Sequence, residues 1–228
     1  MAGGKETPRQ KMIGMMYLVL TALLALQVSN AVLEKFIFID KALSRMVDDY
    51  GTKNNQTISN IEAQVKKRNS KEDEVAILNV AKEVRQKTGE VIKTMSDLKE
   101  EMVNITGGRD EETGGLIGAK DIDKVATMMI QQNKGKELKA QLNEYSKFLA
   151  AKTGRPEGDF PALAKDAKDY KEFENDPNQK DKRFAELFFE ATPTAAGMAT
   201  VSYLETEVLN YRSEEHTLNS SHVAISYA

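Results

Sequence analysis

A single uncharged stretch near the amino terminus limits what this chain can fold into. Residues 12–33 include no Asp, Glu, Lys or Arg, whereas 29% of the whole chain is charged. As a helix rising about 1.5 Å per residue, the stretch would span roughly 33 Å, close to the roughly 30 Å hydrocarbon core of a bilayer. A signal peptide typically has a shorter apolar region, of about 7–15 residues. We therefore expect a retained transmembrane helix over residues 12–33.

Two other interpretations of the stretch stay open, a cleaved signal peptide and a buried helix of a soluble domain. Residues 29–31 could pass as a cleavage site, but the helical pattern continues through them. The cations Lys5, Arg9 and Lys11 precede the stretch, which by the positive-inside rule places residues 1–11 in the cytoplasm. We expect a single-pass protein of the cell inner membrane with residues 34–211 in the periplasm.

Apolar residues recur at spacings of three and four along most of the chain, which predicts an all-α fold. One continuous helix is predicted over residues 8–49, followed by a turn at 51–55 and a short helix at 57–67. Further helices are predicted at 121–132 and 136–152. The clearest heptad seam comprises Ile77, Ala81, Val84, Thr88, Val91, Met95, Leu98, Met102 and Ile105.

Such long, regularly patterned helices predict an elongated periplasmic bundle that continues the transmembrane helix. The glycines that follow Ile105, Gly107 and Gly108, should end the seam helix. The residues predicted for the bundle core are Phe36, Ile39, Leu43, Ile77, Val84, Val91, Met95, Leu98, Met102, Leu142, Tyr145 and Leu149.

The last segment of the chain, residues 212–228, lacks a helical apolar pattern. Its sequence, RSEEHTLNSSHVAISYA, resembles a translated sequencing-library adapter. We expect a non-native tail there and exclude it from the fold prediction. Both histidines of the chain, His216 and His222, lie in this segment.

The composition argues against catalysis. The chain has no Cys, and outside the expected tail it has no His, so triads, thiolate chemistry and zinc sites are excluded there. The glycines at 107–118 lack the Lys-Ser or Lys-Thr pair of a phosphate loop. A net charge of −3 gives no reason to expect nucleic acid as a partner. We expect neither a cofactor nor a metal, and a protein that is not an enzyme.

The predicted membrane helix carries one face on which another helix could pack closely. Its small residues are Gly14, Thr21, Ala25 and Ser29, and Tyr17 lies near them. Arg9 precedes the uncharged stretch by less than one turn. This arginine either extends to the lipid headgroups or meets a carboxylate on a partner helix. The face itself either contacts a partner or reflects only the usual composition of membrane helices.

The amino-terminal sequence KETPRQKMIGMMYLVLTALLALQVSNAVLEKF, residues 5–36, resembles the GldM/PorM family of the type IX secretion and gliding machinery. The resemblance is specific over residues 5–46 and looser to about residue 210. It implies a helical first periplasmic domain, followed by β-rich domains that reach toward the outer membrane. It also implies homodimers whose membrane helices lie inside a ring of GldL-type helices. GldK- and GldN-type components would be reached through the later C-terminal domains.

On this resemblance, Arg9 would face acidic residues of the GldL-type partner, and Tyr17 would lie on the buried surface between helices. The proton-carrying carboxylate would belong to the partner, because residues 12–33 contain none. The expected function is to couple motion driven by the proton gradient to periplasmic and outer-membrane components. The alternative is a periplasmic helical-bundle sensor or scaffold anchored by one transmembrane helix.

Overall fold

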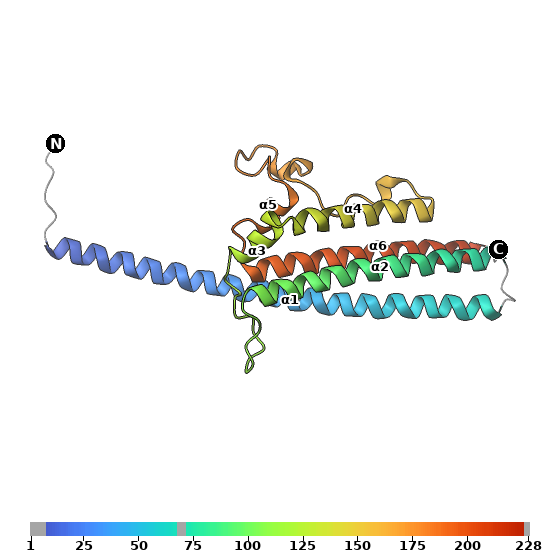
Figure 1. Cartoon of the computed structure of the whole chain (residues 1–228), viewed down its shortest axis with the longest axis horizontal. Helices are drawn as coiled ribbons and strands as arrows, with labels where there is room; N and C mark the ends of the chain where they lie inside the picture. Colours follow the sequence, from blue (N-terminus) through green and yellow to red (C-terminus); the bar gives the residue numbers. More distant parts are fainter. Residues whose placement is uncertain (1–7, 68–71, 226–228) are drawn as a thin grey trace.

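The structure is an elongated helical bundle from which one long helix projects (Figure 1). The computed structural model describes residues 8–67 and 72–225, except for the side chains of residues 22–29, 73 and 213–225. In this part no strand occurs, and a single isolated bridge joins Arg109 to Leu116. The all-α prediction is therefore confirmed. The α-helices are α1 Pro8–Lys67, α2 Glu72–Ile105, α3 Lys124–Ala126, α4 Lys134–Thr153, α5 Phe184–Phe189 and α6 Thr194–Ile225.

Three long helices, α1, α2 and α6, run side by side, and α4 lies along α2 (Figure 1). The first half of α1 extends alone beyond the end of this bundle. Among the described residues, no helix is long and apolar enough to cross a membrane. The side chains of residues 22–29, in the middle of the expected membrane span, lie outside the described part.

Helix α1 does not end where the sequence predicted. We expected a turn at residues 51–55, but α1 continues unbroken from Pro8 to Lys67. A glycine inside a helix costs about 0.5–1 kcal/mol relative to alanine, which is too little to break a helix that is packed on both sides of it. Ile58 and Val65, beyond the expected turn, are buried against the bundle. Their burial outweighs the cost of Gly51.

The seam that α1 buries is shifted by one residue from the predicted one. The prediction placed Phe36, Ile39 and Leu43 in the core, but Ile39 is 44% exposed, and the other two are only half-buried. The prediction is wrong for Ile39 and holds only in part for Leu43 and for Phe36, which packs against Leu33, because a second stripe lies about 100° away on α1 and the sequence does not say which one faces inward. The inner seam, at alternating spacings of four and three, is Leu33, Ile37, Asp40, Ser44, Val47, Gly51, Asn54, Ile58, Ile61 and Val65.

The seam of α2 is confirmed. Its central positions, from Ala81 to Met102, are all buried, and the two end positions, Ile77 and Ile105, are half-buried. The helix ends as predicted, because Gly107 and Gly108 have φ values of 109° and 83°, a region that favours glycine. The Gly108 amide donates to the Val103 carbonyl at 2.9 Å, which satisfies one of the last free carbonyls of the helix.

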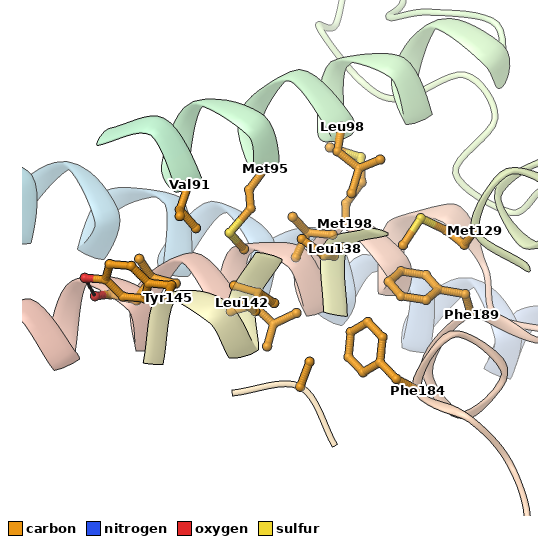
Figure 2. Packing of buried hydrophobic residues seen from close by; sticks show 14 of the residues in the cluster. Val91, Met95, Leu98, Met129, Leu138, Leu142, Tyr145, Phe184, Phe189 and Met198 are labelled. Carbon is orange, nitrogen blue, oxygen red and sulfur yellow. Dashed lines mark hydrogen bonds between the residues drawn. The ribbon is translucent and has the colours of Figure 1, made fainter. Parts of the chain in front are cut away.

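The main core lies where α2, α4, α5 and α6 meet (Figure 2). The predicted residues Leu142, Tyr145 and Leu149 of α4 are fully buried in it. The Tyr145 hydroxyl lies 2.9 Å from the Thr88 hydroxyl of α2, so the one polar atom of this ring is hydrogen-bonded inside the core. Helix α5 adds Phe184 and Phe189, whose rings pack edge to face.

The connection after α2 differs from the prediction. Instead of one helix over residues 121–132, the chain forms the short α3 and a π-helix at Thr127–Gln131. Val125, Met128 and Met129 are buried as expected, but Ile122 is 43% exposed because it precedes the helix.

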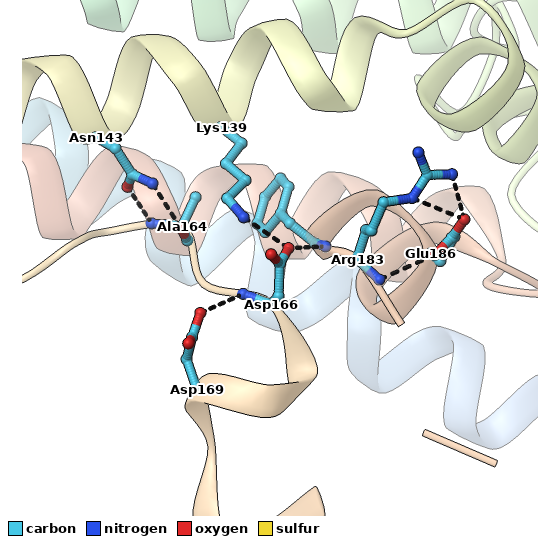
Figure 3. A network of polar contacts seen from close by, with 8 residues as sticks. Lys139, Asn143, Ala164, Asp166, Asp169, Arg183 and Glu186 are labelled. Atoms are coloured by element: carbon cyan, nitrogen blue, oxygen red, sulfur yellow. Dashed lines mark hydrogen bonds and ion pairs between the residues drawn. The ribbon is translucent and has the colours of Figure 1, made fainter. Parts of the chain in front are cut away.

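The connection between α4 and α5 is fastened to the bundle by side-chain bonds to its backbone (Figure 3). The Asn143 amide of α4 donates to the Ala164 carbonyl at 2.9 Å and accepts from the Ala164 amide at 3.0 Å. The Lys139 ammonium lies 2.6 Å from the Asp166 carboxylate. This connection is only partly helical. Its three 3-10 turns are Glu157–Asp159, Ala167–Asp169 and Lys171–Phe173.

Replacing Gly51 with alanine tests whether α1 is unbroken. A Cβ atom at this position would meet no atom within 4 Å, so the methyl group fits. We expect Gly51→Ala to raise the free energy of unfolding by about 0.5–1 kcal/mol, because alanine loses less backbone entropy in a helix than glycine does. Chemical unfolding followed by circular dichroism measures the change. A loss of stability would indicate the turn instead.

Candidate functional site: the junction between α1 and the bundle

The residues predicted to contact a membrane partner lie on the projecting part of α1. Arg9, Gly14, Tyr17 and Thr21 are all exposed there. The Thr21 hydroxyl donates to backbone carbonyls of its own helix, with the Tyr17 oxygen 2.8 Å away. The side chains of Ala25 and Ser29 lie outside the described part. The bundle does not cover this face, and its contact with a partner stays a prediction.

The projecting part of α1 meets the bundle at a small apolar cluster. Leu33, the last residue of the uncharged stretch, is buried with Ala119 and Ala195. Phe36, Ile37 and Leu116 pack around these three side chains. The Ala195 amide donates to the Ala119 carbonyl at 3.2 Å, which ties the start of α6 to the loop after α2.

The glycine-rich loop after α2 has a structural role at this junction. A Cβ atom on Gly118 would lie 2.2 Å from the Thr106 carbonyl oxygen, so only glycine fits at this close approach. The next residue, Ala119, is thereby placed against Leu33 of α1. The pattern of glycines along the chain carried no sign of this packing role.

Less than two turns beyond Leu33, a chain of polar contacts joins three helices, and we call it the junction network. The Ser202 hydroxyl of α6 donates to the Asp40 carboxylate of α1 at 2.7 Å. The Lys99 ammonium of α2 donates to the same hydroxyl oxygen at 2.9 Å and to the Glu205 carboxylate at 2.7 Å. Glu205 is 2% exposed and Ser202 is fully buried. The network therefore fixes the axial positions of α1, α2 and α6 relative to one another.

The junction network carries more carboxylates than cations. Burial raises the pKa of the Glu205 carboxyl above its ordinary value of 4.5, the adjacent Lys99 ammonium lowers it, and the carboxylates of Asp40 and Asp48 raise it again, for a net increase. The Lys99 ammonium is thus the main group that compensates the buried negative charge of Glu205.

Sequence reasoning missed the junction network because charged residues on a helix usually lie in solvent. A signal was nevertheless present in α6. Its buried positions form two parallel seams, one of which consists of Val201, Leu204 and Val208. The other contains polar residues at the same four-three spacing and consists of Met198, Ser202, Glu205, Leu209 and Arg212. A helix with two seams must pack on two sides, and α6 lies between α1 and the main core.

The geometry describes a rod-like helical scaffold rather than a catalytic centre. Among the described residues, no group of three or more His, Cys, Asp or Glu side chains could hold a metal ion. The strongest polar constellation, the junction network, lies between helices and joins them. The class that these features define is a structural, all-helical protein with one projecting helix.

The chain belongs to the GldM family, because the family model of the GldM N-terminal domain matches residues 31–219. A comparison with curated proteins finds no match. The match begins at the junction and covers the bundle, whereas most of the motif that carried the resemblance precedes it. The resemblance is thereby confirmed over residues 31–219, which include the end of the motif and the part of the chain where the resemblance was looser. Members of this family are structural components of gliding motility and type IX secretion, which indicates a location in the cell envelope.

Breaking the junction network should destabilise the bundle far more than breaking a surface ion pair. Lys99→Met leaves the buried Glu205 charge without a counter-ion, and we expect a loss of about 3–5 kcal/mol in the free energy of unfolding at neutral pH. Lys134→Met is the matched control, because Lys134 pairs with Glu101 at 3.4 Å on the surface. That change should cost about 0–1 kcal/mol. Urea unfolding of both variants measures the difference.

The loss in the free energy of unfolding caused by Lys99→Met should also depend on pH. The folded-state pKa of Glu205 is raised, so the protonated carboxyl favours folding, and this contribution declines as the pH rises above about 4.5. Without Lys99 the pKa rises further, so the deficit of the variant should shrink as the pH is lowered toward 4.5. Equal, pH-independent losses in the Lys99 and Lys134 variants would contradict the role given to the network.

Proposed function

We propose that this protein is the inner-membrane coupler of a type IX secretion and gliding motor. In this role it carries motion from a GldL-type membrane partner to periplasmic and outer-membrane components. The observation that carries the proposal is the unbroken course of α1, from Pro8 to Lys67. At about 1.5 Å per residue this helix is roughly 90 Å long. It leads from the uncharged stretch directly into the bundle, so no flexible linker lies between them.

The contacts of α1 support mechanical coupling. Its inner seam packs against α6 over most of the bundle and against α2 near its end. The apolar cluster at Leu33 and the junction network at Asp40 fasten it where it enters. A displacement or rotation of the projecting half therefore has to move α6 and α2 with it, because sliding α1 would separate the Asp40 carboxylate from Ser202.

The membrane part of the proposal rests on the sequence of the projecting half. We propose that residues 12–33 cross the inner membrane with residues 1–11 in the cytoplasm. Gly14, Tyr17 and Thr21 are exposed and free of the bundle, as a partner-contacting face requires. Arg9 would meet a carboxylate of the GldL-type partner, because a charge near the membrane interior is stabilised by an opposite charge.

We further propose that the second stripe of α1 packs against a second copy of the chain. This outer stripe contains Val32, Ile39 and Met46, which are 48%, 44% and 41% exposed, and the half-buried Phe36, Leu43 and Tyr50. Its spacings alternate between four and three, as in the seam of a coiled coil. An apolar helical seam that the bundle covers only in part is typical of a surface for another helix.

A flexible insert tests the coupling. Four Gly/Ser residues between Glu34 and Lys35 should abolish secretion of a type IX reporter substrate, because the projecting half could then move without the bundle. The same insert between Glu111 and Glu112, in an exposed loop, is the control and should preserve secretion. Membrane insertion is verified for both by resistance to carbonate extraction. Normal secretion with the insert at Glu34 would refute the coupling.

The same assay tests Arg9. Arg9→Ala should insert into the membrane but fail in secretion, and Arg9→Lys should retain part of the activity because it keeps the charge. Lys11→Ala serves as the control for loss of a flanking cation. If Arg9→Ala secretes normally, the proposed contact of Arg9 with a partner carboxylate is wrong.

Cysteine crosslinking tests the second copy. The chain has no Cys, so a single introduced cysteine reports on one position. Ile39→Cys should form a disulfide-linked dimer in oxidised membranes, because equivalent positions of two outer stripes would face each other. Glu34→Cys, an exposed position outside both seams of α1, should stay monomeric. Dimers at both positions, or at neither, would contradict the assignment of the outer stripe.

A further inference from the structure

A cationic cavity lies beside the junction, at the edge of the inner seam of α1, whose residues Ile37, Asp40 and Ser44 form part of its wall. It has a volume of about 320 Å³ and lies between α1, the glycine-rich loop after α2, and the start of α6. Lys41 and Arg45 line it from α1, one helical turn apart, and Arg109 lines it from the loop. Gly114 and Gly115 form part of the opposite wall.

The cavity has an excess of positive charge. Its lining contains three cations and one carboxylate, that of Asp40. Asp40 already accepts a hydrogen bond from Ser202, and among the described residues no ion pair involves Lys41, Arg45 or Arg109. Three cations that converge on one space repel each other, and an anion bound between them would relieve the repulsion. The cavity therefore favours an anionic ligand.

The position of the cavity indicates which anion could reach it. Lys41 and Arg45 follow Leu33, the end of the uncharged stretch, by about 12 and 18 Å along the helix axis. Helical side chains tilt toward the amino-terminal end of their helix, so both cations point back toward that stretch. A long cationic side chain reaches several ångströms farther, which brings Lys41 to the level of the lipid headgroups and leaves Arg45 just outside that layer.

We propose that this cavity binds the phosphate group of an anionic lipid headgroup, in the leaflet from which α1 emerges. The arginine guanidinium groups of Arg45 and Arg109 can each donate two parallel hydrogen bonds to phosphate oxygens, and Lys41 adds a point charge. The bound phosphate would link α1 to the loop and thus close the junction on its third side. This inference rests on the membrane anchoring proposed above.

The test measures thermal unfolding of the full chain in nonionic detergent micelles. Because the chain has no Trp, the helical circular dichroism signal is followed. Phosphatidylglycerol, at about 100 times its Kd, should raise the Tm by on the order of 5 °C, and phosphatidylcholine of the same chain length should raise it much less. The double variant Arg45→Gln/Arg109→Gln should lose the response. The double variant Lys66→Gln/Lys67→Gln, which removes two exposed cations at the far end of α1, should keep it.

Three results would overturn the inference. The first is an equal rise in Tm with both lipids, and the second is a full rise in Arg45→Gln/Arg109→Gln. The third is a full rise with inorganic phosphate alone, which would make free phosphate the ligand. The conservative double variant Arg45→Lys/Arg109→Lys keeps both positive charges, so phosphatidylglycerol should still raise its Tm. Carbonate extraction distinguishes a failure of the membrane anchoring from a failure of lipid binding. If carbonate removes the wild-type chain from membranes, the anchoring is wrong. The micelle experiment does not depend on that result, because lipid supplied in micelles reaches the cavity in either case.

Discussion

The structure depends on the packing of α1 against α6 and α2. This interface has no continuous apolar seam, because Asp40, Ser44, Gly51 and Asn54 occupy inward positions. It is held by apolar contacts at both ends, with Leu33 at the entry and Ile58 and Val65 at the far end, and by the junction network between them. A uniformly apolar seam could slide by one heptad at little cost, whereas the half-buried Asp40 carboxylate with one matching hydroxyl, that of Ser202, has a single favourable position.

That specificity is what a coupling element requires. Buried ion pairs contribute little net stability, because the cost of removing charges from water offsets their attraction. Breaking the Lys99–Glu205 pair is costly, however, and this cost opposes movement of α2 relative to α6, whereas the Ser202–Asp40 hydrogen bond opposes movement of α1 relative to α6. We therefore interpret the junction network as a device that fixes position. The glycine-rich loop serves the same end, since Gly118 lets the chain approach Thr106 closely enough to place Ala119 against α1.

Helix α1 presents different faces to different surroundings. The inner seam faces the bundle, the outer stripe at Val32, Ile39 and Met46 is exposed, and the cavity at Lys41 and Arg45 borders the inner seam. In the functions proposed here these faces meet α6, a second copy and lipid phosphate, respectively. One continuous helix can make all three contacts because its side chains point in different directions from a single axis. A movement of the helix therefore displaces all three contacts together.

The local features of this protein can be predicted from its sequence. The seam of α2 and the glycines that end this helix depend on neighbouring residues, so periodicity and backbone preference were sufficient to predict both. Three features depend on contacts between distant segments and became clear from the packed fold. These are which stripe of α1 is buried, the continuation of α1 through Gly51, and the contact of Lys99 with Glu205 across helices. Adjacent stripes on one helix are nearly equivalent until a neighbouring helix covers one of them. The choice depends on α6, whose residues lie more than 150 positions away along the chain from Asp40.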